Sequence, residues 1–193
     1  MRVISGTARG RRLKEPAGFK IRRTSDKVKE AIFNIVQFDI EGRRVLDMFA
    51  GTGQFGIEAM SRGARSVDFV DIRPESVKLI RENLKICGFQ DYASVYARDA
   101  LRFIEGIGKY DLIFMDPPFD AGLADKTLTK IIEIDKLNTN GIIICELDAA
   151  STIPAASPPY LMRKDYRYGG VRIVRYDRIA LEASAQDNDP DGV

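Results

Sequence analysis

Two short motifs in this sequence place carboxylates beside residues that can shape a ligand site. The first is the segment Asp47–Gly56, DMFAGTGQFG, in which an acid precedes a glycine-rich turn. Glycines let the backbone approach a ligand closely, and the N–H groups at the start of a following helix favour polar or anionic groups. The segment contains a GxGxxG pattern, and Asp71, 20 residues after Gly51, could bind ribose hydroxyls. The motif predicts a nucleotide-like ligand, and an NAD-dependent dehydrogenase is one interpretation of it.

The second motif is Asp116-Pro117-Pro118-Phe119, which directly follows the apolar run Leu112–Met115. Consecutive prolines fix the backbone and donate no N–H, so the carbonyls around Pro117 can remain as rigid acceptors. Asp116 adds a carboxylate, and Phe119 adds a flat apolar face. This combination suits a planar base whose amino group needs acceptors and whose ring needs a stacking surface.

A third, shorter segment is Arg98-Asp99-Ala100. The Asp99 carboxylate and a neighbouring backbone amide could meet the amino group and a ring nitrogen of an adenine. Asp is also an ordinary residue at the start of a helix, so the segment is equally compatible with a helix cap.

The composition limits the chemistry that these motifs can perform. The 193 residues include no histidine, which excludes histidine general bases and Ser-His-Asp triads. The two cysteines, Cys87 and Cys145, have no CxxC spacing and are expected to be buried free thiols, so no metal site is expected. The chemistry must come from carboxylates, backbone groups or a reactive cofactor.

The elements that must position these motifs follow from the hydrophobic pattern. Short apolar runs alternate with amphipathic stretches, which is typical of an α/β fold with a mostly parallel sheet and helices on both faces. The predicted strands are Arg44–Phe49, Ser66–Asp71, Ala93–Ala97, Asp111–Asp116 and Gly141–Leu147. The predicted helices are Phe55–Ser61, Pro74–Ile86, Ala100–Glu105 and Ala124–Ile134. All three motifs then lie at the carboxyl edge of the sheet, where ligands of such folds bind.

Further elements flank this core. The apolar spacing over Thr24–Ile40 predicts a helix before the first strand, capped by Ser25 or Asp26. Leu161–Tyr168 and Val171–Leu181, separated by two glycines, predict a C-terminal antiparallel hairpin. We therefore expect a short N-terminal extension over residues 1–23, one domain over 24–181, and a disordered acidic tail over 182–193.

The N-terminal extension is strongly basic, although the net charge of the chain is only +2. Residues 1–30 carry ten Lys or Arg side chains and three acidic ones. Such a cluster is typical of a protein that binds nucleic-acid phosphates, but a solvated basic face is an equal alternative on charge alone. No segment is long and apolar enough for a membrane span or a signal peptide, so we expect a cytoplasmic protein without a membrane partner.

The order of these motifs resembles that of the class I, Rossmann-like S-adenosylmethionine methyltransferases. More narrowly, four segments are similar to the RsmD family, which methylates the exocyclic N2 of guanine in 16S ribosomal RNA. These segments are ISGTARGRRL, RRTSDKVKEAIFNIV, LDMFAGTGQFGIEAMSRGA and DLIFMDPPF. The resemblance covers nearly the whole chain. It implies a seven-stranded sheet, S-adenosylmethionine as cofactor with S-adenosylhomocysteine as product, no metal, and a monomer that acts on 16S rRNA within a small-subunit assembly intermediate.

The resemblance also implies roles for individual residues. The cofactor would be bound by the residues Asp47, Ala50, Gly51, Thr52, Gly53, Asp71, Ile72, Asp99 and Ala100. Asp116 and Pro117 would hold the target amine, and Phe119 would stack on the base. The RNA phosphates would be bound by Arg9, Arg11, Arg12, Arg22, Arg23, Lys27 and Arg167.

Three alternatives remain open from the residues themselves. The tetrad DPPF also occurs in enzymes that methylate adenine or cytosine amino groups in DNA or RNA, so adenine N6 is a possible target. The glycine motif alone fits an NAD-dependent oxidoreductase, although the chain offers no histidine for hydride chemistry. The basic extension alone fits an RNA-binding module without catalytic activity.

Overall fold

The computed structural model describes residues 1–16, 24–106, 108–118 and 122–180. Its strands are β1 (Arg44–Met48), β2 (Ser66–Asp71), β3 (Ala93–Ala97), β4 (Tyr110–Met115), β5 (Leu137–Asp148), β6 (Tyr160–Tyr168) and β7 (Val171–Arg178). Its helices are α1 (Asp26–Ile35), α2 (Gln54–Ser61), α3 (Pro74–Cys87), α4 (Ala100–Ile104) and α5 (Leu123–Glu133), with a short 3₁₀ turn at Gln90–Tyr92. None of the helices in these ranges has the length and apolarity required to cross a bilayer.

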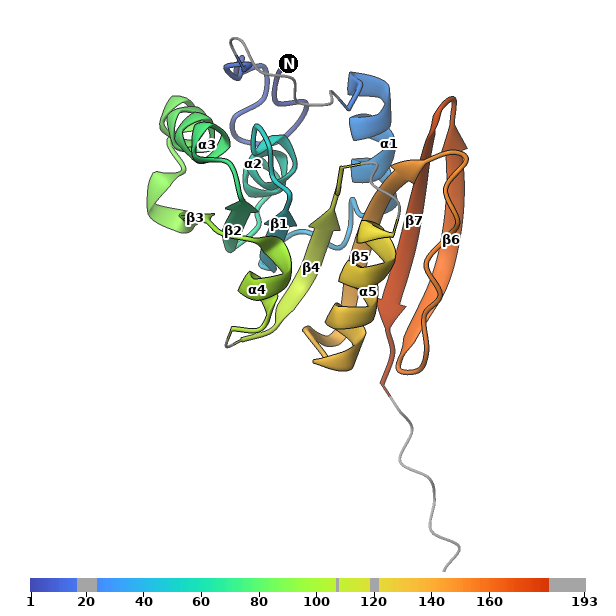
Figure 1. Cartoon of the computed structure of the whole chain (residues 1–193). Coiled ribbons are helices and arrows are strands. Elements are labelled where there is room, and N and C mark those ends of the chain that lie inside the picture. The colour runs from blue at the N-terminus through green and yellow to red at the C-terminus, as the bar shows by residue number, and fades with distance from the viewer. Residues whose placement is uncertain (17–23, 107, 119–121, 181–193) are drawn as a thin grey trace, which may run out of the picture.

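The seven strands form one sheet in the order β3-β2-β1-β4-β5-β7-β6 (Figure 1). The strands from β1 to β5 pair in parallel, whereas β7 pairs antiparallel with both β5 and β6. The predicted α/β class and the C-terminal hairpin are therefore confirmed. The strand order reverses between β1 and β4, and the crevice outside the carboxyl ends of such a pair is where open parallel sheets bind ligands.

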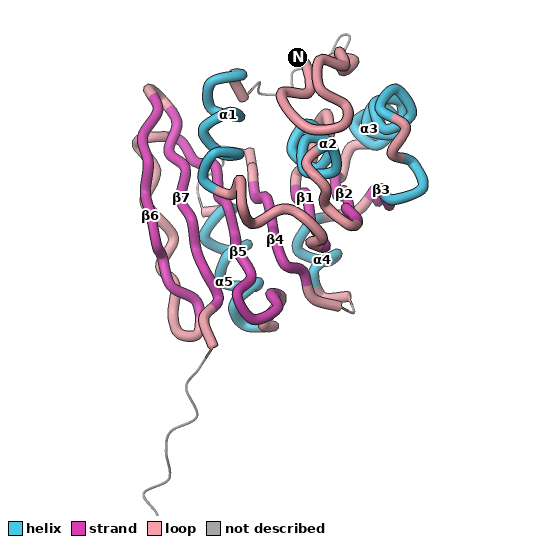
Figure 2. The backbone as a smooth tube through the Cα atoms, turned by 180° about the vertical axis from the view of Figure 1, so that it is seen from behind, coloured by secondary structure: helices cyan, strands magenta, loops and turns pink. Residues whose placement is uncertain are grey.

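Helices cover both faces of the sheet, and alternate strand residues point to each face. On one face, α1, α2 and α3 pack against Val45 and Phe114, which belong to one apolar cluster. On the other face, α4 and α5 pack against Leu46 and Met115 in a second cluster. Figure 2, turned by 180° from Figure 1, shows α1 and α2 in front of the sheet and α5 behind it. The two cores hold the strand ends rigidly at the edge that carries the motifs.

Most elements lie within three residues of their predicted bounds, and two differ by more at one end. The helix expected over Thr24–Ile40 begins after Ser25, whose Oγ accepts a hydrogen bond from Val28 N at 3.2 Å, and it ends at Ile35. The chain then turns, so that Ile40 is buried while Phe38 is 92% exposed. The prediction that the helix continues to Ile40 is therefore wrong. The turn after Ile35 brings Ile40 back into the core. β5 is also longer than predicted, since it begins at Leu137.

The N-terminal arm, defined here as residues 1–16, packs against the outside of α2 rather than standing apart from the domain. The arm doubles back on itself through a bridge between Arg2 and Arg12. Its apolar side chains Val3, Ala8 and Leu13 join the same core as α1 and α2. The arm is therefore anchored by burial as well as by hydrogen bonds.

Candidate active site

Asp47 lies at the end of β1 and is 1% exposed. Its Oδ2 accepts a hydrogen bond from Gly56 N at 2.9 Å, which ties the strand to the first turn of α2. Its Oδ1 is buried and has no hydrogen-bond partner among the described residues. Burial raises the pKa of Asp47 well above its usual value, the Gly56 N–H opposes this, and the charges of Asp116 and Asp71 add to it. A buried acceptor without a partner is unfavourable unless a ligand supplies a donor.

The glycine loop, residues 49–53, turns tightly between β1 and α2. Phe49, Gly51 and Gly53 all have positive φ, at 59°, 56° and 76° respectively. Positive φ is uncommon for a phenylalanine and often marks a functional turn. At Gly56, an added Cβ would lie 2.3 Å from the Phe69 ring, so this glycine allows α2 to approach β2. The loop lies where the glycine motif predicts it. Gly51 and Gly53 are required by their positive φ, and Gly56 is required by the packing of α2 against β2.

Asp71, at the end of β2, holds the glycine loop in place. Its Oδ2 accepts a hydrogen bond from Gly51 N at 2.8 Å, and its Oδ1 accepts one from Arg73 N at 2.9 Å. The Arg73 guanidinium also forms an ion pair with Asp71, at 3.1 Å. Ile72 is 66% exposed at the same edge and offers an apolar surface. Asp71, which is expected near the ribose, thus lies beside the loop, and Ile72 directly follows it at the end of β2.

Asp99 caps α4, and its Oδ1 accepts a hydrogen bond from Arg102 N at 3.0 Å. The capping interpretation is therefore confirmed. Asp99 is exposed and Ala100 is buried, and both closely follow β3 at the carboxyl edge of the sheet. The adenine-binding role of this pair stays a prediction.

Asp116 and Pro117 lie just beyond β4, beside Asp47. Asp47 pairs with Phe114 in the β1–β4 register, and Asp116 follows two residues after Phe114, directly beyond the end of β4. Asp116 is half-buried and Pro117 is buried. Burial is the largest cause of the raised pKa of two groups, Asp47 and the Cys145 thiol. The charge of Asp116 raises the pKa of both groups further. Phe119 lies outside the described residues.

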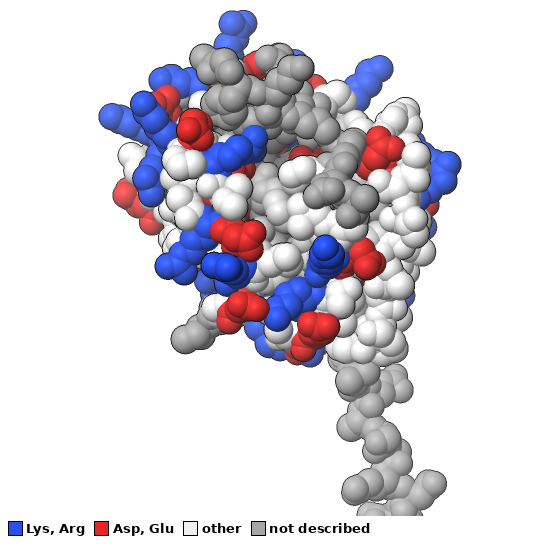
Figure 3. Space-filling model, in the orientation of Figure 1, with Lys and Arg blue, Asp and Glu red and all other residues white. Residues whose placement is uncertain are grey.

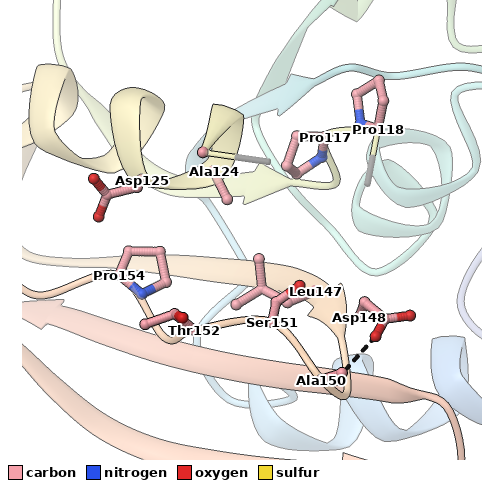
Figure 4. Close-up of a pocket in the computed structure, with 11 residues that line it drawn as sticks. Pro117, Pro118, Ala124, Asp125, Leu147, Asp148, Ala150, Ser151, Thr152 and Pro154 are labelled. Atoms are coloured by element: carbon pink, nitrogen blue, oxygen red, sulfur yellow. Dashed lines mark hydrogen bonds between the residues drawn. The ribbon is translucent and has the colours of Figure 1, made fainter. Parts of the chain in front are cut away.

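A cavity of about 750 Å³ opens next to Pro117, on the side of the sheet covered by α5 (Figure 4). It is lined by Pro117, Pro118, Gly122, Ala124, Asp125, Leu147, Asp148, Ala150, Ser151, Thr152 and Pro154. The sequence interpretation missed Asp148 as a site residue. Its signal was present, because Asp148 directly follows the strand-like segment Ile142–Leu147, which is apolar except for Glu146, just as Asp71 and Asp116 follow their strands.

The basic residues expected to bind phosphates are exposed where the structure describes them. Arg9, Arg11 and Arg12 are exposed on the arm, and Figure 3 shows further Lys and Arg side chains, interspersed with acidic ones, on the side of the molecule formed by α3. Lys27 on α1 and Arg167 on β6 are exposed as well, whereas Arg22 and Arg23 lie outside the described residues. In the register of the sheet, Arg167 of β6 lies opposite Arg172 of β7, and Arg172 lies opposite Leu147 of β5, which lines the cavity. Arg167 therefore lies near the carboxyl end of β6, two strands away from Leu147 in the sheet.

Comparison with known proteins agrees with this geometry. The sequence model of the family described as "Conserved hypothetical protein 95" matches residues 1–177. The chain is 38% identical to "Putative rRNA methyltransferase YlbH" of Bacillus subtilis, over 92% of this chain and 99% of that protein. It is 31% identical to "Ribosomal RNA small subunit methyltransferase D" of Escherichia coli K12, over 97% of this chain and 94% of that protein.

A solved structure supports the same relationship. The "Putative methyltransferase yhhF from Escherichia coli" superimposes with a TM-score of 0.83 at 28% identity, over 94% of this chain and 99% of that one. These matches favour the methyltransferase interpretation of the glycine loop over the NAD-dependent one. The segment Asp116-Pro117-Pro118, which we call the Asp-Pro-Pro corner, lies with the glycine loop at one edge of the sheet. The family match over residues 1–177 and these relatives show that the chain belongs to the RsmD family of methyltransferases.

Proposed function

We propose that this protein transfers a methyl group from S-adenosylmethionine to the exocyclic N2 amine of a guanine in small-subunit ribosomal RNA. The observation that carries the proposal is the convergence of Asp47 and Asp116 at the switch point between β1 and β4. Relatives named as small-subunit rRNA methyltransferases support the RNA substrate. Guanine N2 is favoured over adenine N6 by the resemblance to the RsmD family.

The residues around the glycine loop fit the proposed cofactor. Asp47 keeps one buried oxygen without a partner, and a ligand ammonium group would supply the missing donor. Asp47, Asp71 and Asp116 form a cluster of carboxylates whose mutual repulsion a cationic ligand would relieve. When bound, S-adenosylmethionine supplies an electrophilic methyl group on a positively charged sulfur. The Asp99-Ala100 pair would contact the adenine, and Ile72 would add to the cofactor site.

The Asp-Pro-Pro corner would act by positioning the nucleophile. Guanine N2 is a poor nucleophile because its lone pair is delocalised into the ring. Hydrogen bonds from N2–H to the Asp116 carboxylate and the Pro117 carbonyl would favour a more pyramidal nitrogen, with its lone pair aimed at the methyl group. Such alignment can contribute roughly 7 to 11 kcal/mol to lowering a barrier, which exceeds the usual contribution of one general base. Phe119 follows directly in the sequence and would stack on the base.

The basic residues would hold the surrounding RNA. A base must leave its stack to reach the corner, which suits a nucleotide in a loop. Arg9, Arg11 and Arg12 on the arm would bind flanking phosphates on one side of the site, and Arg167 would bind them on the other. We propose a small-subunit assembly intermediate as the substrate and a monomeric enzyme.

Mass spectrometry of nucleosides tests the proposal directly. Small-subunit particles from cells that lack the protein would be incubated with purified protein and S-adenosylmethionine. We expect N2-methylguanosine to appear in the RNA in stoichiometric amount. If N6-methyladenosine appeared instead, the assignment of guanine as the target base would be wrong. If no methylated nucleoside formed, the proposal that this protein methylates small-subunit RNA would be wrong.

A calorimetric titration separates the remaining alternatives. We expect binding of S-adenosylmethionine and S-adenosylhomocysteine, and none of NAD. Binding of NAD alone would favour an oxidoreductase. Binding of RNA without affinity for any of the three would favour a module without catalytic activity.

A further inference from the structure

We propose that the cavity beside Pro117 receives the target guanine, and that Asp148 accepts its N1–H and thereby selects guanine over other bases. This inference rests on the proposed function, because it assumes that the amine held at Asp116 and Pro117 belongs to a guanine. It goes further by naming the residue that reads the base.

The cavity begins where the Asp-Pro-Pro corner ends. Pro117 is common to both, so a base held by its amine at the corner extends over Pro117 into the cavity. Met115 pairs with Cys145 at the end of the β4–β5 register, and Pro118 and Asp148 each lie three residues beyond that pair. Figure 4 shows Pro117 and Pro118 on one wall and Leu147 and Asp148 on the facing wall. Asp148 is therefore placed against the edge of a base that enters past Pro117.

The charges of the cavity favour a base and disfavour a phosphate. Among the described residues that line it, the only charged ones are Asp125 and Asp148, and both are acidic. A phosphate would be repelled by this lining, whereas the donor-bearing edge of a base would be attracted. Pro117, Leu147 and Pro154 supply apolar surfaces against which a ring can pack. The volume of about 750 Å³ lies within the range of pockets that bind small ligands.

Guanine is the base that matches a carboxylate at this place. On its Watson–Crick edge, the N2 amine and the N1–H are adjacent donors. Adenine and cytosine carry an acceptor nitrogen next to their amine, and a carboxylate facing that lone pair would repel it. With N2 at Asp116 and Pro117, the next group along the guanine edge is N1–H.

Asp148 is held in a fixed orientation for this contact. Its Oδ1 accepts a hydrogen bond from Ala150 N at 2.9 Å, at the start of the loop that follows β5. This bond leaves Oδ2 as an acceptor for a ligand, since each carboxylate oxygen has two lone pairs. An asparagine at this position could keep the bond to Ala150 through its own Oδ1 and would present an NH₂ donor in place of Oδ2.

D148N replaces an acceptor of Asp148 with a donor, which should alter the preference of the enzyme between two bases, and this preference can be measured. 2,6-Diaminopurine has the same N2 amine as guanine but carries an acceptor at N1. The guanosine that the wild-type protein methylates would first be mapped, and RNA with either guanosine or 2,6-diaminopurine riboside at that position would be made by splinted ligation. We expect wild-type protein to prefer guanosine by at least about 100-fold in kcat/KM, because the analogue places an acceptor opposite the Asp148 carboxylate. We expect D148N to lower this ratio by at least about tenfold, with unchanged affinity for S-adenosylhomocysteine.

Two further variants keep the test specific. D91N removes an exposed carboxylate on the 3₁₀ turn far along the chain from the cavity, and it should keep the wild-type ratio. D125N removes the other acid of the cavity; if the ratio shifted in D125N and not in D148N, the assignment to Asp148 would be wrong. An unchanged ratio in D148N would also overturn the inference while leaving the proposed function intact. The proposed function itself fails only if wild-type protein forms no N2-methylguanosine.

Discussion

Lys29 Nζ lies 3.3 Å from Glu58 Oε2, and neither side chain is exposed to solvent. Glu58 also accepts hydrogen bonds from the backbone N–H groups of Ile4 and Ser5, at 2.7 and 2.9 Å. Lys29 Nζ in turn donates to the carbonyl of Arg2 at 2.6 Å. This buried pair therefore joins α1, α2 and the arm that carries Arg9, Arg11 and Arg12.

Glu58→Ala should destabilise the protein by about 3 to 5 kcal/mol, because it leaves a buried ammonium and two backbone N–H groups without their acceptor. Urea unfolding followed by circular dichroism measures this. Glu82→Ala is the matched control: Glu82 forms an exposed ion pair with Lys14 at 2.9 Å, and its loss should change the stability far less than the loss of Glu58. Similar losses in the two variants would contradict a structural role for the buried pair.

Asp116→Ala should reduce methyl transfer by at least about 100-fold while leaving the affinity for S-adenosylhomocysteine nearly unchanged. The reason is that Asp116 is proposed to hold the target amine, and misplacing a reacting atom by about 1 Å can cost a factor of this size. Single-turnover transfer from labelled cofactor to small-subunit particles measures the rate, and calorimetry measures the affinity. Normal turnover in this variant would remove Asp116 from the mechanism.

Asp47→Asn should weaken cofactor binding at least about tenfold, because it replaces a carboxylate that is proposed to meet a cationic group. For the wild-type protein, affinity should rise as the pH rises through the raised pKa of Asp47, since only the ionised form attracts the cation. Calorimetry over a series of pH values measures both effects. The same pH dependence in wild type and variant would show that another group is responsible.

The same substitution should stabilise the protein without ligand at neutral pH. A buried carboxyl whose pKa is raised on folding holds more protons in the folded than in the unfolded state, so stability falls as the pH rises from the unfolded pKa to the folded one. Asn cannot ionise and can still accept the Gly56 N–H. We expect thermal unfolding of the variant to lose this pH-dependent decrease; a variant less stable than wild type at neutral pH would disprove the prediction.

Gly56→Ala should cost about 1 to 3 kcal/mol, because the new methyl group would lie 2.3 Å from the Phe69 ring and 2.8 Å from Val67. Gly170→Ala is the control, since nothing lies within 4 Å of its added Cβ. Thermal unfolding compares the two. Equal melting temperatures would mean that α2 can move away from β2 freely.

Replacement of Arg9, Arg11 and Arg12 by alanine should weaken RNA binding and lower its salt dependence. Each lost phosphate contact should reduce the slope of log K against log salt by roughly 0.7 to 0.9, so the triple variant should lose about 2 to 3. Fluorescence anisotropy at several salt concentrations measures the slope. An unchanged slope would identify the arm as a solvated basic face.

Much of the site could be predicted because the pattern that identifies it is local. Apolar runs of strand length each end in an acid at Asp47, Asp71 and Asp116, and a glycine turn follows the first of them. In a parallel sheet all carboxyl ends meet at one edge, so strand periodicity alone brings these three acids together. The ends of the elements were less predictable: α1 ends at Ile35 because the burial of Ile40, a tertiary contact, overrides helical spacing.

The tertiary structure decided how each of these residues is used. It tied Asp71 to Gly51, left an oxygen of Asp47 without a partner, and placed Asp148 against the prolines. It also fixed the arm to α2 through Glu58, 53 and 54 residues away in the chain. Periodicity reports which face of an element is apolar, whereas pairing between distant polar groups depends on how the packed layers bring them into hydrogen-bond distance. That is the physical reason why the sequence alone indicated which edge of the sheet carries the candidate site, and only the fold showed which of its polar atoms have no partner within the described residues.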